Sequence, residues 1–249
     1  MHPKFDYLLR LGDNCLVLSQ QLGAWCGHGP ALEEDLALTN VALDLLGQAR
    51  LWLSYAAEVE GAGRDEDALA FGRDVFDFRN LLLVEQPNGH YGDTVARQFL
   101  FDVWHQQLLA GLARSNDGRI AEIAVKSAKE VRYHLERSAH LVVALGDGTP
   151  ESHGRMQASV ERLWPYTNEW FESDPVDAFC AEAGLAPAAP SLAAPWRASV
   201  SVVLARATLA VPDYTGHQRG GRTGVHSEHL GHLLSELQFV QRAYPGAQW

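Results

Sequence analysis

The chain has 249 residues, of which 47% are hydrophobic, and it carries a formal net charge of −11 at pH 7. An acidic chain argues against a nucleic-acid partner, because phosphates attract basic surfaces. No apolar run approaches the roughly 18–20 residues that cross a bilayer. Charges also interrupt the N-terminal stretch MHPKFDYLLRLGDN, where a signal peptide would need an apolar core. We therefore expect a cytoplasmic protein with no membrane partner.

The first part of the chain predicts two long helices. Asp13 is expected to cap a helix that stops at Gly27–Pro30, and a second helix is expected from about Ala31 to Glu60. Acidic residues in the first turn of the second helix suit its dipole. A polar break follows at 61–68, and residues 79–93 hold a short apolar run and a Pro-Asn-Gly loop.

The second part also reads as helical. Asp93 or Thr94 is expected to cap a helix that runs to about residue 115, and residues 116–148 predict another. Pro165 should interrupt the next helix, and residues 173–195 form a Pro/Ala-rich connection with one short helix. Residues 196–211 fit either a strand or a helix, and a Gly-rich loop precedes a final helix over 225–244. We predict an all-α bundle of about seven or eight helices in a single domain, 1–249.

Polar residues interrupt three of the expected core stripes. Asp102 and His105 lie between apolar residues on one helix face, at a spacing that places both side chains together. Asp44 stands among leucines, and Glu130 shares a mixed face with His134. A buried carboxylate is costly unless it is paired or bound to metal, so something must satisfy these groups.

The four residues Asp44, Asp102, His105 and Glu130 resemble part of a di-metal site. Such a site takes a carboxylate, a Glu-x-x-His pair, a second carboxylate and a second Glu-x-x-His pair from successive helices. The fourth helix offers Glu161 but has Trp164 in place of the histidine. We favour a metal-free buried polar network, which Lys126, Arg132 or Arg137 could join. The alternative is an occupied metal site with His134 as a further ligand.

Two other segments are candidates for sites. The final helix carries His226, His229, His232 and Glu236 near one face, which fits either a zinc site or a solvated or interfacial surface. The loop 216–224 holds two arginines between glycines, which fits either a plain flexible loop or a contact with phosphate. For the helix we favour a solvated or interfacial surface, and for the loop we favour a plain flexible loop. Most of the seven tryptophans are expected in the core, namely Trp25, Trp52, Trp104, Trp164, Trp170, Trp196 and Trp249.

Longer stretches carry a family resemblance. Residues 11–50 (LGDNCLVLSQQLGAWCGHGPALEEDLALTNVALDLLGQAR), 80–89 (NLLLVEQPNG) and 226–249 (HSEHLGHLLSELQFVQRAYPGAQW) resemble the C-subunit family of the bacterial phenylacetyl-CoA epoxidases, also called ring-1,2-phenylacetyl-CoA epoxidases. The resemblance extends from about Leu9 to Trp249. It implies a ferritin-like helical bundle and a structural, non-catalytic role in aerobic phenylacetate catabolism.

The resemblance also implies partners and cofactors. A catalytic subunit of similar fold would hold the di-iron site and epoxidise the aromatic ring of phenylacetyl-CoA with O₂. A further, small subunit would join the hetero-oligomer, and a reductase with FAD and an iron–sulfur centre would transiently deliver electrons from NADPH. The chain itself would hold no cofactor, and contact of loop 216–224 with coenzyme A stays open.

Two readings from other classes remain beside the structural one. In the first, the chain is itself an enzyme, a metal-binding ferritin-like oxidoreductase with a partial di-metal site of its own. In the second, it is a ferritin-like storage protein, for which the sequence supplies neither ferroxidase ligands nor cage contacts.

Overall fold

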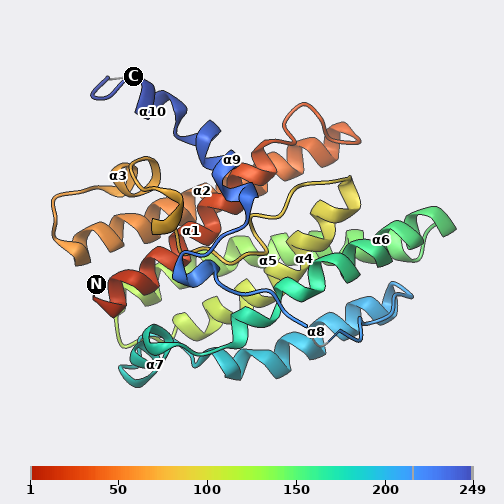
Figure 1. Cartoon of the computed structure of the whole chain (residues 1–249). Helices are drawn as coiled ribbons and strands as arrows, with labels where there is room; N and C mark the ends of the chain where they lie inside the picture. Colours follow the sequence, from red (N-terminus) through yellow and green to blue (C-terminus); the bar gives the residue numbers. More distant parts are fainter. Residues whose placement is uncertain (1, 215, 248–249) are drawn as a thin grey trace. The chain divides into compact units, whose positions relative to one another are not determined.

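The computed structural model describes residues 2–214 and 216–247, and every regular element in these ranges is a helix (Figure 1). The all-α prediction is therefore confirmed. Ten α-helices are present in these ranges, and eight of them have at least eight residues, which agrees with the predicted seven or eight. The chain divides into two compact units, Met1–Pro87 with Arg219–Trp249, and Asn88–Gln218. The single-domain prediction stays a prediction.

The first unit is built on helix α1 (Pro3–Gly23), which packs along α2 (Leu32–Glu60). His2 caps α1, because its Nδ1 accepts a hydrogen bond from the Lys4 N–H at 3.2 Å. The prediction that Asp13 begins this helix was wrong, since Asp13 lies in the middle of α1. The predicted bounds of α2 are confirmed to within one residue, and Gly61 ends that helix in the left-handed region at φ +66°.

Asp13 is fully buried and forms an ion pair with Arg73. The Arg73 guanidinium donates to both carboxylate oxygens of Asp13, with an Nη1–Oδ2 distance of 2.9 Å. The Arg79 backbone N–H donates to the same carboxylate at 2.8 Å. Asp13 thus ties α1 to the segment that follows α3 (Glu66–Phe71), across 60 residues of sequence.

The C-terminal segment of the first unit lies on the same stretch of backbone. Gln238 donates from Nε2 to the carbonyl oxygens of Ala70 and Arg73, each at 3.0 Å. Gln238 is buried, and it separates α9 (Glu228–Leu237) from α10 (Phe239–Ala243). The single final helix that the sequence predicted is therefore two, because this side chain turns inward to the two carbonyls.

The second unit contains α4 (Tyr91–Leu112), α5 (Gly118–Gly146), α6 (Pro150–Leu163), α7 (Pro175–Glu182) and α8 (Ala193–Arg206). Helix α4 begins at His90, and Asp93 completes its capping box by accepting from the His90 N–H at 3.0 Å. The prediction that Asp93 or Thr94 stands at the start of this helix was therefore wrong by three residues or more, although Asp93 takes part in the capping box as the third helical residue.

Two further expectations for the second unit are confirmed, and the strand-or-helix alternative left open for residues 196–211 is decided in favour of a helix. Helix α6 ends before Pro165, where a 3₁₀ turn (Trp164–Tyr166) follows. The Pro/Ala-rich connection holds one short α-helix, α7, together with a 3₁₀ turn at Ala189–Leu192. The ambiguous segment after it is helical, as α8.

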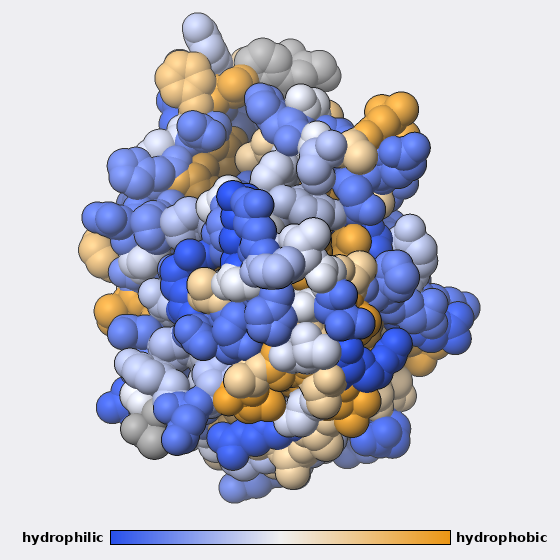
Figure 2. Space-filling view, turned by 90° about the vertical axis from the view of Figure 1, so that its right-hand side faces the viewer, coloured by the Kyte–Doolittle hydropathy of each residue, from blue (hydrophilic) through white to orange (hydrophobic). Residues whose placement is uncertain are grey.

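The apolar side chains of the helices lie mostly in the interior, and some reach the surface. In the ranges 2–214 and 216–247, none is both long and apolar enough to cross a membrane. Figure 2 shows one face of the molecule, on which hydrophobic side chains reach the surface in groups between hydrophilic ones. Most large apolar residues are buried, and the exposed ones are therefore informative about what the surface contacts.

The Asp13–Arg73 pair predicts a large stability difference between two arginine substitutions. Arg73→Met leaves a fully buried carboxylate without its counter-ion, so we expect unfolding free energy to fall by roughly 3–5 kcal/mol. The control is Arg50→Met, since Arg50 pairs with Glu66 at 3.1 Å but 76% of its side chain is exposed. That change should cost about 0–1 kcal/mol. Urea denaturation followed by circular dichroism measures both, and equal losses would contradict a structural role for the buried pair.

Candidate functional site

The predicted pair Asp102 and His105 lies in α4, at the centre of the second unit. Asp102 is fully buried and His105 is 3% exposed, so the predicted burial of both is confirmed. Their spacing of three residues places the two side chains on one face of the helix. Helix α4 is buried on most of its circumference, which leaves its polar side chains to be satisfied from within the unit.

Two neutral side chains hold the Asp102 carboxylate. Gln98, one turn earlier in α4, donates from Nε2 to Oδ1 at 2.7 Å. Ser138 of α5 donates from Oγ to Oδ2 at 2.8 Å, so each oxygen has a partner. The polar network that the sequence predicted is therefore present around Asp102, but its hydrogen-bond donors are an amide and a hydroxyl that the sequence reasoning missed.

The environment of Asp102 favours its protonated form. Burial raises the pKa of this carboxyl to about 6, against the charge of His134 and the two hydrogen bonds, which act to lower it. Arg137 lowers the pKa as well, with the smallest effect, so of the basic residues expected to join the network it is the one that acts on Asp102. Lys126 and Arg132 are exposed on α5.

His105 is held neutral by its surroundings. Burial, with a smaller contribution from His134, lowers the pKa of its imidazole to about 3. Its ring lies 5.0 Å from the Phe101 ring and 6.3 Å from the Trp104 ring, centroid to centroid. Nδ1 of His105 is buried and has no hydrogen-bond partner among the described residues. A neutral imidazole is the form that binds metal, so protonation alone does not exclude that role.

Glu130 does not share this buried position. It is half-exposed on α5, while its neighbour Val131 is fully buried. Consecutive helix residues point about 100° apart, so a helix that buries Val131 turns Glu130 to its flank. His134, also on α5, is 1% exposed and faces the interior. The expectation that Glu130 lies in the core with Asp102 was wrong, and His134 is the α5 residue that acts on Asp102.

Asp44 lies in α2, in the first unit, and is half-exposed. The expectation that core leucines surround it was wrong for two of them, because Leu43 is 59% and Leu46 is 42% exposed. The buried face of α2 runs instead through Leu38, Val41, Ala42, Leu45, Gln48, Ala49, Trp52 and Leu53.

The second Glu-x-x-His position of a di-metal site is filled by other groups. Glu161 is exposed and accepts a hydrogen bond from Gln157 Nε2 at 2.8 Å. Trp164 is buried and its ring lies 5.4 Å from that of Trp196, centroid to centroid. Across residues 2–214 and 216–247, no three His, Cys, Asp or Glu side chains converge closely enough to hold a metal ion.

Tryptophans form much of the core of the second unit. The Trp170 ring lies 5.6 Å from both the Trp104 and the Trp196 ring, and Trp196 Nε1 donates to the Leu100 carbonyl at 3.1 Å. Five tryptophans are buried, as predicted, namely Trp52, Trp104, Trp164, Trp170 and Trp196. Trp25 is half-exposed, and Trp249 lies outside the described residues.

The histidine-rich segment does not form one ligand set. His226 precedes α9, and its side chain is buried, with Nδ1 2.9 Å from Glu85 Oε2 and Nε2 3.0 Å from the Phe78 carbonyl oxygen. His229 is half-exposed, and His232 and Glu236 are exposed on α9. His226 is thus a structural residue that binds a buried carboxylate, and the other three lie on an accessible helix face.

The part of the glycine-rich loop that belongs to the first unit, residues 219–224, packs against the segment around Asn80. Gly221 packs against the backbone of Asn80, where a Cβ would collide with the carbonyl oxygen. Gly224 has φ +83°, a conformation that favours glycine. Gly221 and Gly224 therefore have a packing role, and contact of the loop with coenzyme A stays an open alternative.

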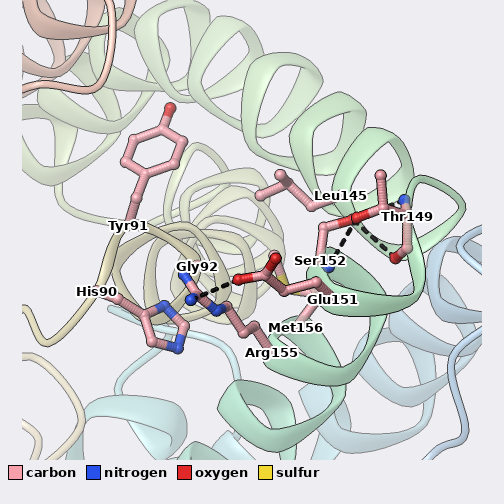
Figure 3. A pocket seen from close by; sticks show the side chains of 9 residues that line it. All are labelled: His90, Tyr91, Gly92, Leu145, Thr149, Glu151, Ser152, Arg155 and Met156. Atoms are coloured by element: carbon pink, nitrogen blue, oxygen red, sulfur yellow. Dashed lines mark hydrogen bonds and ion pairs between the residues drawn. The ribbon is translucent and has the colours of Figure 1, made fainter.

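A separate pocket of about 250 Å³ lies in the second unit, where α4 and α6 begin. Figure 3 shows its lining side chains, which come from the start of α4, the end of α5 and the first turns of α6. Arg155 and Glu151 pair with each other there at 2.6 Å, and Asp102 does not line it. The pocket is therefore not part of the candidate site.

Asp102 predicts a pH dependence of stability. Folding raises its pKa from about 3.9 in an unfolded chain to about 6. Between these values the folded chain keeps a proton that the unfolded chain has released. The resulting stabilisation, on the order of 3 kcal/mol, is complete below pH ~4 and is lost as the pH rises through about 6. Asp102→Asn cannot titrate, so the variant should gain stability relative to the unmodified chain from pH 4 to pH 7, measured by urea denaturation.

Because folding lowers the pKa of His105, this residue makes the stability of both proteins rise with pH. Taking the difference between the variant and the unmodified chain cancels that contribution. Asp213→Asn serves as the control, because Asp213 is an exposed carboxylate in a loop. Its stability difference from the unmodified chain should stay within a few tenths of a kcal/mol at each pH, as for other surface changes. A flat difference for Asp102→Asn would show that the fold keeps Asp102 ionised throughout this range.

Comparisons with known proteins agree on one family. A family model described as "Phenylacetic acid catabolic protein" matches residues 1–249. A relative from Escherichia coli (strain K12), the C subunit of 1,2-phenylacetyl-CoA epoxidase, is 53% identical over 249 residues, and the match covers 100% of both chains.

Proposed function

The chain belongs to the phenylacetic acid catabolic protein family, and on this premise we propose that it is a non-catalytic structural subunit of a multicomponent di-iron oxygenase. The enzyme would epoxidise phenylacetyl-CoA in aerobic phenylacetate catabolism. The full-length similarity to the C subunit of such an epoxidase supports the assignment. The observation that carries the non-catalytic role is the bonding of Asp102. Both of its carboxylate oxygens already accept hydrogen bonds from protein side chains.

In this proposal the iron belongs to a partner. A di-iron site needs two histidines and four carboxylates from four helices, and the donor set in this chain lacks the second Glu-x-x-His pair. The chain would pair directly with a catalytic subunit that holds the di-iron centre. The small subunit would complete the cytoplasmic hetero-oligomer, and a reductase carrying FAD and an iron–sulfur centre would pass electrons from NADPH to the catalytic subunit.

The contribution of the chain to catalysis would then be positional. A partner that packs against a rigid surface keeps its own helices, and the ligands they carry, in productive geometry. The interior of this chain suits that task, because fixed polar contacts such as Ser138 to Asp102 at 2.8 Å link its helices.

One observation favours a second candidate function. The buried Nδ1 of His105 lacks a hydrogen-bond partner among the described residues, and a metal ion could satisfy it. The chain would then be a metal-binding ferritin-like oxidoreductase that uses Asp44, Asp102, His105 and Glu130. The positions of Asp44 and Glu130 argue against this function, because both residues are half-exposed.

Metal analysis separates the two functions. The chain is purified alone and in complex with the catalytic subunit, and iron is quantified per chain. We expect well below one iron per molecule and no turnover of phenylacetyl-CoA for the chain alone, but iron and turnover for the complex with its reductase. Two irons per molecule together with turnover by the isolated chain would overturn the structural role.

A matched pair of variants extends this test. Asp102→Asn and His105→Asn in the complex should leave the iron content of the catalytic subunit unchanged. A loss of iron from the isolated chain in both variants would support the metal-binding alternative.

A further inference from the structure

Helix α2 exposes a row of leucines, which we call the leucine face. Leu32, Leu36, Leu43 and Leu46 are 71%, 55%, 59% and 42% exposed. At about 100° per residue the four side chains lie within an arc of about 80°, and they extend over roughly 21 Å of the helix at 1.5 Å per residue. They therefore lie along one side of the helix as two pairs, with Thr39 between them.

The leucine face is not the side that holds α2 in its unit. The buried side of the helix carries a different set, including Leu38, Leu45 and Trp52, which are each at most 1% exposed. A surface helix of a folded domain ordinarily turns a polar side to water. A helix that is apolar on two sides has a second surface to bury, and exposed stripes of this kind mark interaction sites.

A pocket of about 500 Å³ adjoins the leucine face. Leu43 and Leu46 line it, together with apolar side chains of α1 and α3 such as Leu16 and Phe71. Gly47 also lines it, and the space where its side chain would stand is open for 4 Å. The pocket can therefore receive a large apolar side chain from a helix that lies along α2, as knobs enter holes between packed helices.

Charge around the leucine face indicates the kind of partner. In the first turn of α2, Glu33 and Asp35 lie on the two flanks of the leucine face, and the pocket is lined by Glu66 and Asp67. Arg50 lines the pocket as well and pairs with Glu66 at 3.1 Å, so these two charges offset each other and Asp67 gives the pocket its net negative charge. A second copy of this chain would bring the same acidic groups to the contact, and like charges across an interface cost several kcal/mol. A partner with basic flanks is attracted instead.

We propose that the leucine face and its pocket dock an amphipathic helix of the catalytic subunit, with large apolar residues along one stripe and Lys or Arg beside them. This inference rests on the proposed function, because the partner it names is the catalytic subunit. The apolar stripe supplies affinity, and the acidic rim selects a partner with basic flanks over another copy of the chain.

The test measures the dissociation constant between this chain and the catalytic subunit, both purified, by isothermal titration calorimetry. The double variant Leu36→Ser/Leu43→Ser should weaken binding at least about 30-fold, as expected when central apolar contacts are removed. Its thermal unfolding midpoint should change little, because both leucines are exposed. The control Val202→Ser removes a 61% exposed valine from α8 in the other unit and should leave binding unchanged.

A second pair of measurements tests the acidic rim. Glu33→Lys/Asp67→Lys should weaken binding, and it should also reduce the loss of affinity that the unmodified chain shows between low and high salt. An unchanged salt response would overturn the selection of a basic partner.

The remaining outcomes distinguish this inference from the proposed function. If the catalytic subunit binds the unmodified chain and the double leucine variant equally well, the docking surface is wrong and the proposed function stands. If the catalytic subunit does not bind the unmodified chain, both fail. If the unmodified chain dimerises and the double leucine variant is monomeric, the occupant is a second copy and the proposed partner is wrong.

Discussion

A buried ion pair between Asp13 and Arg73 organises the first unit. A carboxylate in the middle of an apolar helix face is tolerated because the guanidinium engages both of its oxygens and the Arg79 N–H adds a third bond. The pair also places the backbone of Arg73, whose carbonyl then accepts from Gln238 and Arg242, each at 3.0 Å. The C-terminal helices therefore dock on a segment that α1 has already fixed.

A second buried carboxylate, Glu85, completes the attachment of the C-terminal segment. Asn80 Nδ2 donates to it at 3.0 Å and the Ser227 N–H at 2.6 Å, while Nδ1 of His226 lies 2.9 Å away. The Phe78 carbonyl can only accept, so Nε2 of His226 must carry a proton, and Nδ1 and Glu85 share another. Two of the stretches that carry the family resemblance, 80–89 and 226–249, meet at this contact.

The sequence predicted the burial of Asp102 and His105 because a charged or ionisable residue stands out in an apolar stripe. It missed Gln98 and Ser138, because amides and hydroxyls do not break such a stripe. It failed for Asp44, because α2 carries leucines on two sides and periodicity does not tell which side is covered. Asp13 was misplaced for a related reason, since an aspartate reads as a helix cap unless its partner, 60 residues away, is known. The helical, ferritin-like class was predictable because long Ala- and Leu-rich segments and the family stretches agree.

The hydrogen-bonded Asp102 of α4 and the exposed leucines of α2 can be considered together. Around Asp102, hydrogen bonds from Gln98 and Ser138 engage both carboxylate oxygens, and a tryptophan cluster packs in the same unit. The apolar surface left open lies outside, on α2 beside its pocket. Asp102 has a pKa of about 6, so at neutral pH it ionises in the folded chain and the stabilisation that its raised pKa provides at lower pH is lost. Asp102 therefore contributes little to net stability at neutral pH. Its directional bond to Ser138 instead links α4 to α5, and together with the exposed leucines of α2 it supports the proposed role as a partner for a second protein.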